Sequence, residues 1–106
     1  MKQNTFSVHF VVRNDRVDED GYAPVYAKIT LNGKPLLLTV NQKVKTIDWN
    51  TKKGIPLPRA ANFNSINESL QAFESRIRTA YSRLVAAAEY IWVDALKDEI
   101  IGKEKL

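Results

Sequence analysis

Residues that could carry catalysis or hold a metal are few in this sequence, and their spacing matches no catalytic motif. There is one histidine, His9, and no cysteine, which argues against a thiolate site, a zinc centre or a histidine-based triad. The acidic residues 18–20 lack the Asp/Asn ladder and closing Glu of a calcium loop, so a solvated turn is the better interpretation. Tyr26 and Tyr81 have no recognisable activating partner in the sequence. We therefore predict no catalytic residue, no metal site and no cofactor.

Positive charge, by contrast, is distributed unevenly along the chain. The net charge is +4; residues 1–60 hold ten Lys and Arg against five Asp and Glu, whereas residues 61–106 hold six against seven. The excess in the first part favours a polyanionic partner at that end of the molecule. The competing interpretation is ordinary surface charge that keeps a domain soluble.

The stretch that must position these charges is residues 24–42, which reads as a β-hairpin. Two alternating runs are separated by Asn32-Gly33, the dipeptide typical of a two-residue type I′ turn. Such a turn fixes the register of the two strands. It predicts these opposite pairs: Leu31 with Lys34, Ile29 with Leu36, Ala27 with Leu38, and Val25 with Val40.

This register gives the hairpin one apolar face and one open face. The apolar face carries Val25, Ala27, Ile29, Leu36, Leu38 and Val40, and the open face carries Tyr26, Lys28, Thr30, Leu37, Thr39 and Asn41. Residues 5–13 alternate in the same way and predict a further strand whose Phe6, Val8, Phe10 and Val12 extend the apolar face. Residues 14–23 predict a loop that turns at Asp20-Gly21, with Pro24 opening the next strand. The three strands then form an antiparallel meander.

The apolar face needs a cover, which the second half of the chain supplies. Residues 65–68 form a capping box, and apolar residues then recur every three or four positions, predicting a helix of about 22 residues over 67–88. Its stripe is Leu70, Phe73, Ile77, Tyr81, Leu84 and Ala88. A short second helix carrying Val93, Leu96 and Ile100 is predicted to end at Gly102.

The predicted fold class is therefore α+β: a three-stranded antiparallel meander covered on one face by a long C-terminal helix, with a short second helix. Between sheet and helix, residues 43–59 are predicted to be irregular, with Val44, Ile47 and Trp49 as core anchors and a turn of helix at residues 48–50. We assign residues 1–90 to one domain. Residues 91–106 are expected to begin a linker toward a domain that this chain lacks.

The open face has the composition of a DNA-reading surface. A small antiparallel sheet can enter the major groove, where Lys28, Thr30 and Asn41 could address base edges and Thr39 could contact a thymine methyl. Arg13, Arg16, Lys34, Lys43 and Lys45 stand at strand ends, where they would meet flanking phosphates. The alternative is that these are simply good solvent-facing strand residues.

The order of motifs resembles the N-terminal arm-type DNA-binding domain of tyrosine recombinases, in particular integrases of conjugative transposons and prophages. The resemblance covers nearly the whole chain and rests on Gly21 and Pro24, residues 29–34, Trp49 followed by Lys52, Lys53 and Gly54, and the helix 67–88. It implies that the sheet enters the major groove of arm-type sites and tethers a recombinase within a synaptic complex. It also implies that catalysis belongs to a separate domain. The predicted DNA-binding residues are Arg13, Arg16, Tyr26, Lys28, Thr30, Asn32, Lys34, Thr39, Asn41, Lys43 and Lys45.

The expected partners are thus double-stranded DNA and other recombinase subunits, with no small-molecule ligand. No apolar stretch is long enough for a membrane span and no signal peptide is visible, so the expected location is the cytoplasm. A second hypothesis is a protein-interaction domain that docks a partner on the open face, including Val11, Tyr26 and Leu37, or on the outer face of the long helix. Salt dependence separates the two hypotheses, because DNA binding weakens steeply as salt rises.

Overall fold

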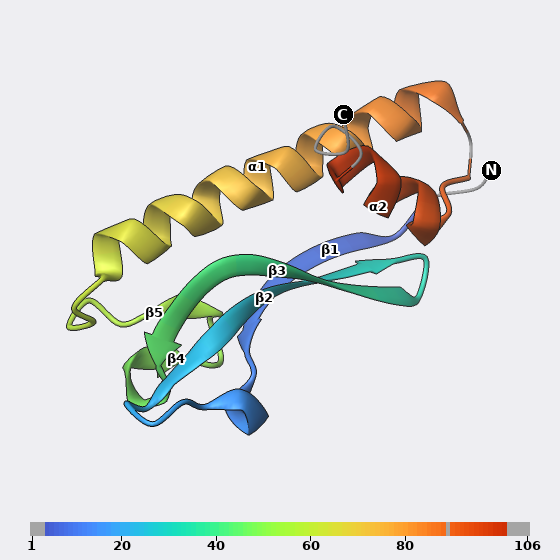
Figure 1. Cartoon of the computed structure of the whole chain (residues 1–106). Coiled ribbons are helices and arrows are strands. Elements are labelled where there is room, and N and C mark those ends of the chain that lie inside the picture. The colour runs from blue at the N-terminus through green and yellow to red at the C-terminus, as the bar shows by residue number, and fades with distance from the viewer. Residues whose placement is uncertain (1–3, 89, 102–106) are drawn as a thin grey trace.

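Three antiparallel strands form a sheet in the order β1–β2–β3, and both α-helices lie on one side of it (Figure 1). The computed structural model describes residues 4–88 and 90–101. The elements are, in chain order, β1 (Phe6–Val12), a 3₁₀ turn η1 (Asn14–Arg16), β2 (Tyr22–Leu31), β3 (Lys34–Lys45), a 3₁₀ turn η2 (Thr46–Asp48), β4 (Trp49–Asn50), β5 (Ile55–Pro56), α1 (Phe63–Ala87) and α2 (Val93–Ile101). The predicted α+β meander under a long helix is confirmed.

The β2–β3 turn has the backbone that Asn32-Gly33 predicts. Both residues have positive φ, 52° and 80°, as a type I′ turn requires. Three of the predicted pairs are present: Leu31 with Lys34, Ile29 with Leu36, and Ala27 with Leu38.

The fourth predicted pair, Val25 with Val40, is wrong because a bulge interrupts the ladder. Pairing passes from Tyr26–Thr39 to Pro24–Lys43, so residues 40–42 of β3 stand opposite Val25 alone. Asn41 lies in this bulge with φ 64°. The inward and outward alternation survives, since Val40 and Val44 are both buried.

The predicted opening of the second strand at Pro24 is also wrong. β2 begins at Tyr22, so Pro24 lies inside the central strand of the sheet. Proline is tolerated within sheets chiefly at edges and bulges, and here the bulge follows it directly. The Pro24 carbonyl still accepts the N–H of Arg13 at 3.1 Å.

The core lies between the sheet and the helices. Fully buried Val25, Ala27 and Ile29 of β2 pack in one cluster with Ile66 and Ile77 of α1. In β1, Phe10 is buried while Phe6, Val8 and Val12 are partly buried against the cluster, as are Leu36 and Leu38 of β3. Phe6 stacks on Tyr81 with ring centroids 4.0 Å apart.

The apolar stripe of the long helix is confirmed except at its last member. Leu70 and Ile77 are buried, and Phe73, Tyr81 and Leu84 pack against the core. Ala88 is exposed, as are residues 85–87 in the last turn of α1, and it follows the helix as its extended C-cap. Although α1 has 25 residues, none of the described helices combines the length and the apolar character that crossing a bilayer requires.

The start of α1 differs from the predicted capping box at residues 65–68. The helix begins at Phe63, and the N-cap Asn62 makes no side-chain cap hydrogen bond. Instead, the Asn62 side-chain amide donates to the Lys43 carbonyl at 2.9 Å, which ties the helix start to the end of β3. Tertiary packing of Phe63 against the core accompanies this earlier start.

Residues 43–59 are more ordered than predicted. β3 continues to Lys45, and the segment at residues 46–50 forms η2 and then β4, which pairs with β5. Val44 and Trp49 are core anchors, but Ile47 is 70% exposed, so its predicted anchoring role is wrong.

The short second helix is present as α2, and its Leu96 and Ile100 belong to the same core as the sheet. Gly102, its predicted end, lies outside the described residues. The start of a linker at residue 91 stays a prediction.

Candidate nucleic-acid interface

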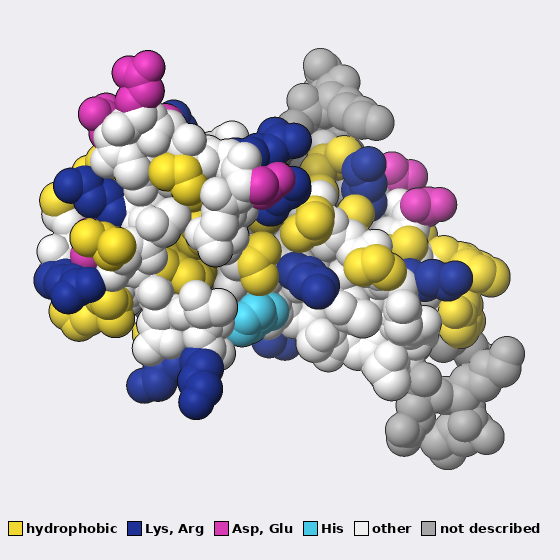
Figure 2. Space-filling view, turned by 90° about the horizontal axis from the view of Figure 1, so that it is seen from below, with side chains coloured by type: hydrophobic (Ala, Val, Ile, Leu, Met, Phe, Trp, Pro, Cys, Tyr) yellow, Lys and Arg dark blue, Asp and Glu magenta, His cyan; other side chains and the backbone are white. Residues whose placement is uncertain are grey.

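The face of the sheet opposite the helices remains open (Figure 2). The ladder aligns its side chains in rows across β1, β2 and β3. The rows are Ser7, Thr30 and Pro35; His9, Lys28 and Leu37; and Val11, Tyr26 and Thr39. Lys28, His9 and Thr39 are exposed, and Leu37 is 46% exposed. These rows contain hydroxyl, imidazole and ammonium groups but no carboxylate.

Arg13 stands at the end of this face beside Tyr26. Its guanidinium lies 5.6 Å from the centroid of the Tyr26 ring and donates two hydrogen bonds, of 3.0 and 2.9 Å, to the Asp15 carboxylate. The hydrogen bond from Arg13 lowers the pKa of Asp15 below its ordinary value, and the same contact raises the pKa of Arg13. Arg13 is thus held in place, but its charge is locally neutralised.

Lys43 is compensated in a similar way. Its ammonium lies 3.7 Å from the Asp18 carboxylate. The other oxygen of Asp18 accepts the backbone N–H groups of Asp20 and Tyr22, both at 2.9 Å. Hydrogen bonding from Tyr22, above all, lowers the pKa of Asp18. The acidic loop therefore supports its own turn and, through Asp15 and Asp18, neutralises two of the cations predicted to bind phosphates.

Four predicted cations have no ion pair within residues 4–88 and 90–101: Arg16, Lys28, Lys34 and Lys45. Lys28 occupies the central strand, and Lys34 lies at the β2–β3 turn. Lys45 lies 5.7 Å from the centroid of the Tyr22 ring, a cation–π geometry that orients the side chain without cancelling its charge.

Two predicted asparagines have different environments. Asn41 is exposed in the β3 bulge, where its backbone N–H donates to the Thr39 hydroxyl at 3.2 Å. Asn32, in contrast, uses its side chain inside the fold: Nδ2 donates to Asn4 Oδ1 at 2.8 Å and to the Ile91 carbonyl at 3.1 Å. Its Oδ1 accepts the N–H of Thr5 at 2.9 Å. Asn32 is therefore not part of the open face.

The structure also brings residues to this region that the predicted set omits. His9 lies in the same row as Lys28. The β4–β5 turn, which carries Lys52 and Lys53, packs against β1 at Gly54. The sequence marks this segment as basic, but a hairpin with two-residue strands carries too little periodicity to be predicted.

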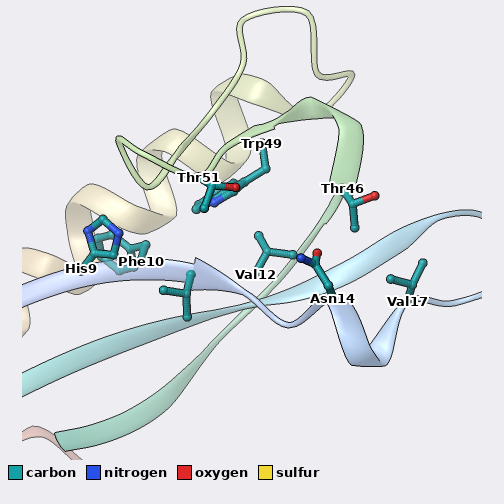
Figure 3. Close-up of a pocket in the computed structure, with 9 residues that line it drawn as sticks. His9, Phe10, Val12, Asn14, Val17, Thr46, Trp49 and Thr51 are labelled. Carbon is teal, nitrogen blue, oxygen red and sulfur yellow. The ribbon is translucent and has the colours of Figure 1, made fainter.

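A pocket of about 320 Å³ lies between β1 and the β4 segment (Figure 3). Its lining is mainly apolar or hydroxyl-bearing, with Val12, Trp49 and Thr51 among its residues, and His9 is its one titratable side chain. In the described part of the chain, no three His, Asp or Glu side chains come together in a way that could hold a metal ion. The pocket thus offers no acid–base pair or ligand set.

Comparison with known proteins identifies the family. The family model described as the arm DNA-binding domain matches residues 10–97, which include β2, β3, the β4–β5 hairpin and α1. No curated protein and no solved structure shows significant similarity to the chain. The chain therefore belongs to the family of arm DNA-binding domains found in tyrosine recombinases.

Proposed function

We propose that this DNA-binding module inserts the open face of β1–β3 into the major groove of duplex DNA. The observation that carries the proposal is the sidedness of the sheet: the helices cover its apolar face, and the opposite face carries exposed polar and cationic side chains. The major groove of B-DNA, about 12 Å wide, admits a β-ribbon. An open sheet face without carboxylates suits the strongly negative groove.

The proposed roles follow the positions of the side chains. Lys28, in the central strand, donates to base edges, and Thr30, Thr39 and Asn41 contact bases around it. Arg13, Arg16, Lys34, Lys43 and Lys45 bind phosphates and set the register on the duplex. Tyr26 positions the Arg13 guanidinium. Asn32 supports binding indirectly by holding the β2–β3 turn.

In the parent recombinase this domain would act as a non-catalytic tether. It would hold the protein at arm-type sites while other domains of the recombinase, and other subunits, act at the crossover site. The residues from 91 onward would lead toward a core-binding domain. A protein that binds the DNA of the cell in this way would work in the cytoplasm.

The test begins by selecting binding sites for the domain from a pool of random-sequence duplexes. Affinities of wild type, Lys28→Ala and Lys45→Gln are then measured on the selected site and on a mixed-sequence duplex. Lys28→Ala should weaken selected-site binding by about 1–3 kcal/mol more than mixed-sequence binding, because it removes a hydrogen bond to a base. Lys45→Gln should weaken both equally, because phosphates carry no sequence information.

Salt dependence supplies the second readout. Roughly five neutralised phosphates give a slope of about −4.5 for log K against log salt. Equal losses for Lys28→Ala on both duplexes would contradict the proposed role of the open face. An affinity that does not fall as the salt concentration rises would contradict DNA binding and would favour a protein partner on the same face.

A further inference from the structure

The turn between β4 and β5 has a fixed backbone that presents two lysines. The Asn50 carbonyl accepts the N–H of Gly54 at 2.8 Å, and the Asn50 side-chain oxygen accepts the N–H of Lys53 at 3.0 Å. The first bond joins two backbone groups across the turn, and the second joins the Asn50 side chain to the backbone of Lys53. Thr51, Lys52 and Lys53 are exposed at its tip.

Gly54 brings this turn into close contact with the edge strand β1. A β-carbon at position 54 would lie 2.8 Å from the Phe10 carbonyl oxygen and 3.0 Å from Cε1 of His9. Gly54 also has φ +66°, a conformation that residues other than glycine rarely adopt. Because His9 lies on the open face, in the row of Lys28, the turn is held next to that face. Figure 3 shows Trp49 and Thr51 lying over β1 close to His9 and Phe10.

The charges of Lys52 and Lys53 are uncompensated, unlike those of Arg13 and Lys43. Neither lysine forms an ion pair within the part of the chain that the structure describes. Figure 2 shows cationic side chains projecting from the lobe beside the histidine. This turn therefore brings two positive charges without an ion-pair partner among the described residues to the β1 edge.

We propose that residues 50–54 form a second phosphate-binding element of the domain, with Lys52 and Lys53 binding the DNA backbone beside β1. Gly54 acts as a positioning residue, since its close approach to β1 fixes where the lysines stand. This inference rests on the proposed insertion of the open face into the groove. The strand ends of β2 and β3 would then bind phosphates with Lys34 and Lys45, while the turn binds them along the β1 edge.

The test measures binding of a fluorescently labelled mixed-sequence duplex across a series of salt concentrations. The variants are Lys52→Gln/Lys53→Gln, Lys45→Gln, and the control Lys97→Gln, which removes an exposed charge from α2 in the helix layer. The double variant should flatten the slope of log K against log salt by about 0.9 for each phosphate that is no longer neutralised. Lys97→Gln should leave the slope unchanged.

The outcomes separate this inference from the proposed function. If Lys45→Gln flattens the slope and Lys52→Gln/Lys53→Gln does not, the second element is rejected while groove insertion stands. The slope change per removed charge can also be compared between the double variant and Lys97→Gln. If the two values are equal, the lysines act only through long-range charge, and the second element is rejected. If the wild-type domain shows no salt-dependent binding, the proposed groove insertion itself is contradicted.

A final variant, Gly54→Ala, tests the positioning role with both lysines retained. It should flatten the slope as the double lysine variant does, and Lys52→Gln/Lys53→Gln added to Gly54→Ala should flatten it no further. Urea unfolding of each variant gives the folded fraction, against which the affinities are corrected. Full additivity of the two changes would overturn the positioning role.

Discussion

At the scale of single residues, Asn32 combines a local role with a tertiary one. Its place before Gly33 predicts the turn, and its φ of 52° agrees. Its side chain, however, binds Asn4 and Ile91, which are 28 and 59 residues away in the chain. Sequence patterns report on neighbours a few residues apart, so they could identify the turn but could not show that this amide is engaged within the fold.

Asp18 is a second residue whose role depends on geometry. One carboxylate oxygen accepts two backbone N–H groups, and the other faces Lys43. Because these contacts favour the ionised form, the pKa of Asp18 lies below its ordinary value of 3.8. A depressed pKa in the folded state means that this stabilisation is fully present above pH 3.8 and is lost as the pH falls through the lowered pKa.

We predict two effects for Asp18→Asn, which keeps the accepting oxygen and removes the charge. The free energy of unfolding should fall less between neutral and acidic pH than in wild type. Lys43 should then bind its phosphate without first leaving its ion pair with Asp18, so the slope of log K against log salt should steepen by up to about 0.9. Denaturant titrations at several pH values and duplex titrations measure these effects. The control Asp98→Asn makes the same change at an exposed residue of α2; an equal effect there would show only a change in net charge.

At the scale of elements, the length of the hydrophobic repeat in each segment decided whether its helix or strand could be predicted. The β2–β3 hairpin and α1 have long alternating or helical repeats, and both are present. β4 and β5 have two residues each, too few for any periodicity. They pair with each other, and Trp49 of β4 is buried in the core. The bulge at residues 40–42 was equally invisible, since Val40 keeps the alternation that a regular strand would have.

The same limit explains why two isoleucines that look alike in sequence differ in the structure. Ile77 lies on the inner stripe of α1 and is fully buried, whereas Ile47 in η2 is 70% exposed. A helical repeat of several turns places Ile77, but a single apolar residue in a short segment has no repeat to place it.

Replacing each isoleucine by alanine tests this assignment of the core. Ile77→Ala should lower the free energy of unfolding by about 2–5 kcal/mol, because it leaves a cavity between α1 and the sheet. Ile47→Ala should change it by no more than about 0.5 kcal/mol. Urea unfolding followed by circular dichroism measures both values. A large loss for Ile47→Ala would mean that η2 packs into the core.

At the scale of the whole molecule, cations occur on both layers, but their surroundings differ. On α1, Arg78 pairs with Glu74, and Arg83 pairs with Glu99 of α2. On the sheet side, Lys28 and Lys45 have no such partner among the described residues. More of the uncompensated charge therefore lies on the sheet side than on the helices, where Lys97 is exposed, although the net charge of +4 says nothing about its distribution.

Two exposed threonines on opposite layers test which side meets DNA. Thr39 lies on the open face and Thr79 on the outer surface of α1, so a new carboxylate at each site probes one layer. Thr39→Glu should weaken binding to a mixed-sequence duplex by about tenfold or more, a loss of about 1.4 kcal/mol, because it brings a negative charge into the groove. Thr79→Glu should have no effect, since its side chain stays in solvent behind the sheet. The reverse result would place the duplex along α1, and the open face would then be available to a protein partner instead.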